Sequence, residues 1–159
     1  VYCMTTVGSI FGGWLPKRFM EKGMDANKAR KTSMFIYALF PLTVLSAQYL
    51  GGFSMWFAVI IIGIATSAHQ AWSANIFTTV SDMFPKRAIA SVTGIGGMAG
   101  AVGGILIAKA AGVLFDHYKA LGDIKIGYGI MFMICATVYI IAWFVMHALV
   151  PKFKKINLE

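Results

Sequence analysis

Long apolar stretches alternate with short charged stretches along this chain. No Asp, Glu, Lys or Arg occurs from Thr32 to Ser81, from Ala88 to Ala108 or from Ile126 to Pro151. Each apolar stretch reaches the length of about 20 residues that crosses roughly 30 Å of membrane hydrocarbon. A backbone inside hydrocarbon must satisfy its own hydrogen bonds, and a helix does so. The pattern therefore predicts an all-α membrane protein.

Five transmembrane helices are predicted, and the first of them is truncated. The predicted spans cover residues 1–15, 34–50, 53–80, 88–115 and 126–149. Polar loops are predicted at 16–31 and 81–87, and a basic C-terminal tail at 151–159. Pro41 predicts a kink in the second span, because proline lacks the N–H that bonds to the preceding turn.

Composition and charge narrow the class of protein further. Of the 159 residues, 58% are hydrophobic and 13% are charged, whereas a soluble domain carries about 25% charged residues. The net charge of +8 invites a nucleic-acid partner. However, the basic residues lie at the ends of apolar stretches rather than along one amphipathic face. We therefore expect the lipid bilayer as a partner, and no nucleic acid.

The basic residues also predict an orientation in the membrane. Eleven of the 14 Lys and Arg residues fall on one side, namely Lys17, Arg18, Lys22, Lys28, Arg30, Lys31, Lys86, Arg87, Lys152, Lys154 and Lys155. The opposite side holds Lys109, Lys119 and Lys125. Cytoplasmic loops carry the excess of Lys and Arg. The two polar loops and the C-terminus are therefore predicted to be cytoplasmic.

The third span holds the densest polar cluster of the chain. At 100° per residue, His69, Gln70 and Ser73 share one helix face, and Trp72 and Asn75 form a polar strip beside it. Amides, hydroxyls and an imidazole beside an indole suit a polyhydroxylated ligand, so these five residues are candidates for substrate binding. The alternative is that they form hydrogen bonds between helices.

Small residues predict two places of close helix packing. Gly8, Gly12 and Gly13 lie in the first span, and the fourth span carries a stripe that includes Gly96, Gly100 and Gly104. Residues without bulky side chains let a second helix backbone approach closely. A dinucleotide-binding role for these glycines is a poor fit, because no strand precedes them.

Catalytic and metal-binding patterns are absent from the sequence. Neither a zinc spacing, a nucleophile elbow nor a catalytic dyad occurs, so no enzyme activity, cofactor or metal is expected. Asp82, at the end of the third span, is predicted to pair with basic groups rather than to carry protons.

Two stretches, Gly8 to Met34 and Ala68 to Gly100, resemble the C-terminal half of bacterial hexuronate transporters. These transporters are a sugar-acid branch of the anion:cation symporters within the major facilitator superfamily. The superfamily's loop motif, G-x-x-x-[DE]-[RK]-x-G-[RK]-[RK], is matched loosely by Gly13, Arg18, Arg30 and Lys31. Lys17 stands where the motif has an acid, and the spacing before the second basic group is longer.

This resemblance implies a partial major facilitator fold, with five of twelve expected helices. It implies a proton-coupled importer of a hexuronate or related sugar acid in the bacterial inner membrane, working by alternating access with an N-terminal half that is missing here. A non-transporting membrane scaffold or assembly subunit remains the alternative.

Overall fold

The structure, a computed structural model, describes residues 2–156 as helices joined by short turns. In chain order the elements are α1 (Tyr2–Glu21), α2 (Ala26–Leu39), a 3-10 segment η1 (Phe40–Ser46), α3 (Ala47–Gly51), α4 (Met55–Met83), α5 (Lys86–Ala120) and α6 (Ile124–Leu149). No strand occurs in this described part. The predicted all-α class is confirmed.

Four helical stretches within residues 2–156 are long and apolar enough to cross a membrane. They are Ala26–Gly51, Met55–Met83, Lys86–Ala120 and Ile124–Leu149. These four correspond to the second to fifth predicted spans. The first predicted span is also helical, but the last turns of α1 contain Lys17, Arg18 and Glu21, and α1 is not among the four.

The loops at the charged end are shorter than predicted. The predicted loop 16–31 is mostly helical, because α1 continues to Glu21 and α2 already begins at Ala26. The predicted loop 81–87 shrinks to Phe84 and Pro85. Long charged side chains reach water from the last turns of a helix, so their presence does not end the helix.

Glycines in the left-handed region end two of the helices. Gly23 has φ +86° and Gly122 has φ +80°. The N–H of Gly23 donates to the Met20 carbonyl at 2.9 Å, and the N–H of Gly122 donates to the Lys119 carbonyl at 3.1 Å. These bonds belong to Schellman motifs, in which glycine takes a backbone conformation that other residues avoid. The Asp25 carboxylate then caps α2.

The helix changes type at Pro41, and the predicted kink itself stays a prediction. The α-helix gives way to the 3-10 segment η1 at Phe40, with Pro41 in its first turn. Proline cannot donate to the carbonyl four residues earlier, and the tighter 3-10 turn does not need that bond. The hydroxyl of Thr43 donates to the Phe40 carbonyl at 2.7 Å, and that of Ser46 donates to the Thr43 carbonyl at 2.7 Å.

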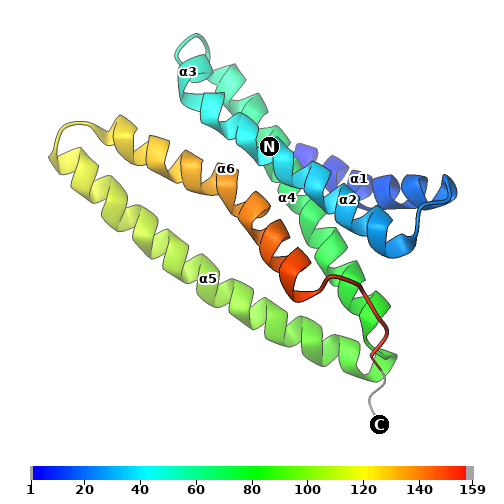
Figure 1. Cartoon of the computed structure of the whole chain (residues 1–159). Helices are drawn as coiled ribbons and strands as arrows, with labels where there is room; N and C mark the ends of the chain where they lie inside the picture. Colours follow the sequence, from blue (N-terminus) through cyan, green and yellow to red (C-terminus); the bar gives the residue numbers. More distant parts are fainter. Residues whose placement is uncertain (1, 157–159) are drawn as a thin grey trace.

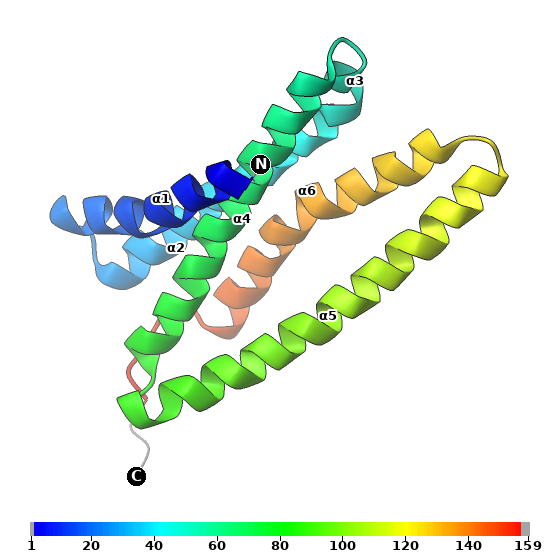
Figure 2. The same cartoon turned by 180° about the vertical axis from the view of Figure 1, so that it is seen from behind.

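Most of the helices pack together, and the long helix α5 lies at the outside of this group. The α2–η1–α3 rod lies between α4 and α6, and α1 crosses α4 on the other side (Figures 1 and 2). The core contains two clusters of buried residues. They are Met34, Ala38 and Trp72 in the first, and Val44, Ala47 and Ile61 in the second. The long helix α5 packs on α6 and meets α4 near their shared turn.

Close packing of α1 against α4 depends on two of the three predicted glycines. A methyl group added at Gly8 would overlap the carbonyl group of Ser67, and one added at Gly12 would lie 2.8 Å from Cα of Ala71. The predicted packing is confirmed at these two positions. At Gly13 such a group would meet no atom within 4 Å in the described chain.

The glycine stripe of α5 has open space beside it. Methyl groups added at Gly96, Gly100 or Gly104 would meet no described atom within 4 Å. None of the described residues of α5 is buried. The close helix contact predicted for this stripe therefore stays a prediction.

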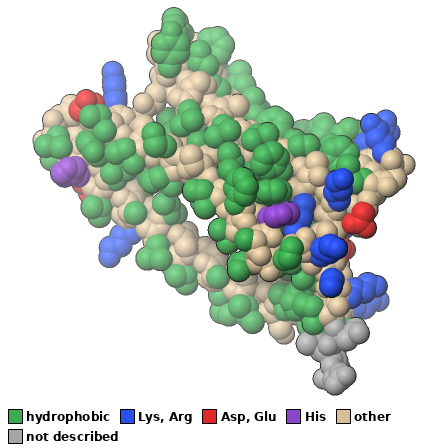
Figure 3. Space-filling view, viewed as in Figure 1, with side chains coloured by type: hydrophobic (Ala, Val, Ile, Leu, Met, Phe, Trp, Pro, Cys, Tyr) green, Lys and Arg blue, Asp and Glu red, His purple; other side chains and the backbone are tan. Residues whose placement is uncertain are grey.

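Charged residues gather at one end of the bundle. The turn between α1 and α2, the turn between α4 and α5, and the segment after α6 meet there. The N–H of Phe153 donates to the Asn27 side-chain oxygen at 3.3 Å, and the N–H of Ile156 donates to the Met83 carbonyl at 2.7 Å. In Figure 3 Lys and Arg cluster at this end, whereas hydrophobic side chains cover much of the remaining face. The predicted grouping of the basic loops on one side is confirmed.

Candidate functional site

The predicted polar face lies at the centre of a membrane-spanning helix. His69 stands midway between the two ends of α4 (Met55–Met83). The side chains of His69 and Gln70 are exposed, and that of Ser73 is half-buried. These three residues therefore lie at a depth where polar groups must face protein, water or a ligand.

His69 makes a polar contact that sequence reasoning missed. Its Nδ1 lies 2.5 Å from the hydroxyl oxygen of Tyr139, which comes from the middle of α6. The two rings meet edge to face, with centroids 5.9 Å apart. The available signal was that two phenol hydroxyls, those of Tyr128 and Tyr139, lie inside the uncharged stretch Ile126–Pro151. Sequence alone could not place Tyr139 beside His69, since the two residues are 70 positions apart.

Trp72 belongs to the core rather than to the exposed face. It is 7% exposed and clusters with Met34 and Ala38. Its ring meets the Tyr139 ring edge to face, with centroids 5.7 Å apart. The indole thus packs behind the phenol that contacts His69.

Asn75 lies between helices and has no free amide hydrogen to offer a ligand. It is 2% exposed, and its Nδ2 donates to the Gly12 carbonyl at 2.7 Å and to the Ala71 carbonyl at 2.9 Å. These contacts favour the alternative interpretation given above, in which Asn75 forms hydrogen bonds between helices instead of binding substrate.

The bond from Asn75 to Gly12 follows from Pro16 in α1. In a regular helix the Gly12 carbonyl would accept from the N–H four residues later, but Pro16 has no N–H. Pro16 is fully buried, so water has little access to replace that donor. The Asn75 amide supplies it instead. A proline in one helix is thus matched by an amide in its neighbour, and α1 continues through the proline to Glu21.

A cavity of about 440 Å³ between α1, α2 and α4 is separate from the polar face. None of the five predicted substrate residues lines it. Its two hydroxyls are already bonded to α1: Ser67 donates to the Met4 carbonyl at 2.8 Å, and Tyr37 donates to the Phe11 carbonyl at 2.6 Å. The remaining lining is apolar, so the cavity offers few partners to a polyhydroxylated ligand.

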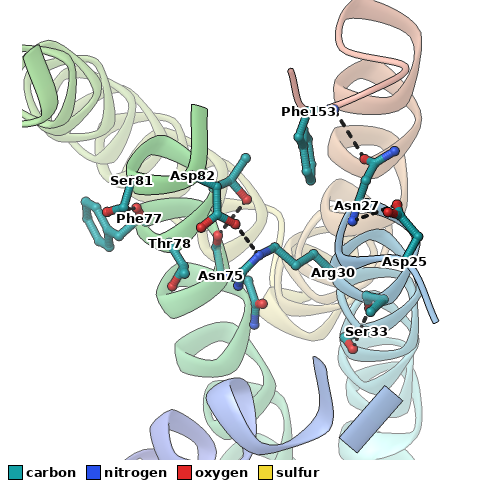
Figure 4. Close-up of polar contacts among 12 residues, drawn as sticks. Asp25, Asn27, Arg30, Ser33, Asn75, Phe77, Thr78, Ser81, Asp82 and Phe153 are labelled. Atoms are coloured by element: carbon teal, nitrogen blue, oxygen red, sulfur yellow. Dashed lines mark hydrogen bonds and ion pairs between the residues drawn. The ribbon is translucent and has the colours of Figure 1, made fainter. Parts of the chain in front are cut away.

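Of the four loop-motif residues, Arg30 and Lys31 join helices. Figure 4 shows Arg30 of α2 reaching Asp82 at the end of α4. The distance from Arg30 Nε to Asp82 Oδ2 is 2.5 Å. The N–H is not aligned on the oxygen, so the contact is an ion pair rather than a regular hydrogen bond. The predicted pairing of Asp82 with a basic group is confirmed. Gly13 and Arg18 are exposed on α1.

Lys31 fastens the segment that follows α6. Its Nζ donates to the carbonyls of Val150 and Pro151, the latter at 2.8 Å, and lies 5.0 Å from the centre of the Phe153 ring. The Trp143 indole donates to the Lys31 carbonyl at 2.9 Å. Lys31 therefore holds the end of α6 and the chain after it against α2. These contacts leave Lys31 only 6% exposed.

Residues 2–156 contain no candidate metal-binding site. No group of three His, Cys, Asp or Glu side chains there is arranged to hold a metal ion. Taken together, the features are those of a multi-pass α-helical membrane protein, with a polar face at mid-depth and ionic contacts at one end.

Comparison with known proteins points to transporters. The hexuronate transporters of Escherichia coli K12 and Escherichia coli O157:H7 are each 30% identical to the chain over 112 residues, which is 69% of the chain and 25% of the transporter. The D-galactonate transporter of Escherichia coli O6:H1 strain CFT073 is 25% identical over 112 residues, covering 70% of the chain and 25% of that protein. The chain thus spans about a quarter of the length of these relatives. No protein-family profile and no solved structure matches it.

Proposed function

We propose that this chain is part of a secondary transporter that imports a hexuronate or related sugar acid by alternating access. The main support for this proposal is the polar face formed by His69, Gln70 and Ser73 at the midpoint of a spanning helix, where His69 and Gln70 are exposed. Transporters of this kind bind substrate near the bilayer midplane between two halves of the fold. The names of the relatives, hexuronate and D-galactonate transporter, support the same class of substrate.

Hydrogen-bond chemistry explains how this face would hold a sugar acid. Imidazole, amide and hydroxyl groups can each donate to or accept from a sugar hydroxyl. A carboxylate additionally calls for a cation, and proton coupling calls for an acid within the membrane. The stretch Thr32–Ser81, which contains the face, has neither. In this proposal both groups come from an N-terminal half of the complete transporter, and the coupling ion is a proton.

Gln70→Ala is expected to raise the apparent uptake constant for D-glucuronate by about 2- to 13-fold, because one hydrogen bond contributes about 0.5–1.5 kcal/mol. The measurement is uptake of radiolabelled D-glucuronate by membrane vesicles containing the complete protein. The matched control is Gln48→Ala. Gln48 is also an exposed amide, but its Nε2 donates to the Lys125 carbonyl at the far end of the bundle, at 2.9 Å. This control should keep the wild-type uptake constant.

Melting temperatures of the same variants separate binding from packing. Gln70→Ala with a wild-type uptake constant and a lowered melting temperature would remove Gln70 from the site. Vesicles of the unmodified protein that take up no sugar acid would contradict the transporter proposal. They would favour a membrane scaffold instead.

The proposed orientation places the basic end of the bundle in the cytoplasm of a bacterial inner membrane. Cys3 and Cys135 are exposed and unpaired, so both are first replaced by Ser. A cysteine in place of Lys22 should then react with an impermeant maleimide only from the cytoplasmic side. A cysteine in place of Leu121, at the opposite end, should react only from outside. The reverse pattern of labelling would invert the topology.

A further inference from the structure

Tyr139 joins α6 to the centre of the polar face on α4. Its hydroxyl oxygen lies 2.5 Å from Nδ1 of His69. The buried Trp72 ring packs edge to face against the phenol and restricts its position. We infer that Tyr139 is a positioning residue: it fixes His69 as the tautomer with hydrogen on Nε2, so that His69 offers an N–H donor to an acceptor oxygen of the ligand.

The surroundings of the hydrogen that is left outside the bond decide between the two possible bonds. A neutral imidazole carries one hydrogen and a phenol hydroxyl carries one. If Nδ1–H donated to Tyr139, the phenol hydrogen would need another acceptor, and the described residues give that hydroxyl no hydrogen-bond partner except His69. If the phenol donates to Nδ1, its hydrogen is satisfied and the imidazole hydrogen sits on Nε2. Each arrangement leaves one hydrogen outside the His69–Tyr139 bond. The second is favoured because that hydrogen then lies on the ring of the exposed His69, where a ligand or water can accept it, rather than on the half-buried Tyr139 hydroxyl.

The consequence of this tautomer appears on the exposed side of His69. The bond to Tyr139 occupies Nδ1, which leaves Nε2 as the ring nitrogen available to other groups. His69 is exposed beside Gln70, so Nε2–H can donate to a carboxylate or hydroxyl oxygen. The identity of that ligand as a sugar acid rests on the proposed function, whereas the tautomer does not. A ligand group that only donates hydrogen bonds would find no acceptor at this nitrogen.

Nitrogen NMR tests the tautomer directly. The complete protein is labelled with 15N-histidine, reconstituted in lipid bilayers and examined at mildly alkaline pH, where an imidazole is neutral. The His69 signals are identified by their loss in His69→Gln. We expect Nε2 to be protonated and Nδ1 to be unprotonated. A ring protonated mainly on Nδ1, or on both nitrogens, would overturn the inference.

Tyr139→Phe removes the hydroxyl and keeps the ring that packs on Trp72. The variant should convert the single His69 tautomer into a mixture. The control is Tyr128→Phe, which removes a phenol hydroxyl from the same helix, where Tyr128 contacts Phe115 instead. This control should leave the His69 signals unchanged. Unchanged His69 tautomer populations in Tyr139→Phe would show that Tyr139 does not position the imidazole.

Ligand affinity separates this inference from the proposed function. Tyr139→Phe should weaken D-glucuronate binding by about 2- to 10-fold, because the donor is present in only part of the population. Wild-type affinity in a variant whose tautomer has become mixed would overturn the role of Nε2–H as a ligand donor. If the unmodified protein shows the expected tautomer but binds no sugar acid, the proposed function fails and the positioning by Tyr139 stands.

Discussion

Gly8→Ala is expected to lower the melting temperature of the protein in detergent. The added methyl group would overlap the Ser67 carbonyl group of α4, and a backbone carbonyl cannot turn aside as a side chain does. The two helices must separate, which also weakens the 2.8 Å bond from the Ser67 hydroxyl to the Met4 carbonyl. Overpacking of this kind typically costs about 1–3 kcal/mol. That cost exceeds the gain of about 1 kcal/mol that alanine brings to a helix.

Gly13→Ala is the matched control for that variant. Gly13 lies in the same helix, and a methyl group there meets no described atom within 4 Å. Only the helix-propensity gain remains, so the melting temperature should stay the same or rise. Equal effects of the two substitutions would mean that α1 does not pack on α4 through Gly8.

Asn75→Leu is expected to destabilise the protein by about 1–3 kcal/mol, the cost of leaving a buried polar group without its partner. Leucine keeps the branched arrangement of heavy atoms, with bulkier methyl groups, but cannot donate to the Gly12 carbonyl, which Pro16 already deprives of its usual donor. The measurement is thermal unfolding of the purified variant in detergent. A wild-type melting temperature would show that the amide is not needed between the helices.

Pro16→Ala provides a sharper test, because it restores the N–H that the Gly12 carbonyl lacks. The loss caused by Asn75→Leu should be smaller in a Pro16→Ala background than in the unmodified protein. A double-mutant cycle measures this difference and cancels the separate packing cost of each substitution. Strictly additive effects would show that Asn75 and Pro16 act independently.

The class of fold and the grouping of the charges at one end could be predicted from the amino-acid sequence. A segment that crosses hydrocarbon can satisfy its backbone hydrogen bonds without neighbouring segments only as a helix, and the uncharged stretch Thr32–Ser81 is long enough for two such segments. The grouping of basic loops at one end follows from counting helices, since each span moves the chain to the opposite side. The helix ends were predicted less well, because charged residues such as Lys17 and Arg18 can extend from a helix end into water.

Which polar and small residues contact other helices depends on how the helices pack in three dimensions. Gly8 and Gly13 are the same residue type on one helix, yet only Gly8 faces a neighbouring backbone. His69 and Asn75 belong to the same polar cluster, yet His69 is exposed and Asn75 is enclosed against α1. Periodicity fixes the angle of each residue around its own helix, but it carries no information about where a second helix lies. The position of Tyr139 beside His69 depends on the packing of α6 against the rest, which pairs residues far apart in the chain.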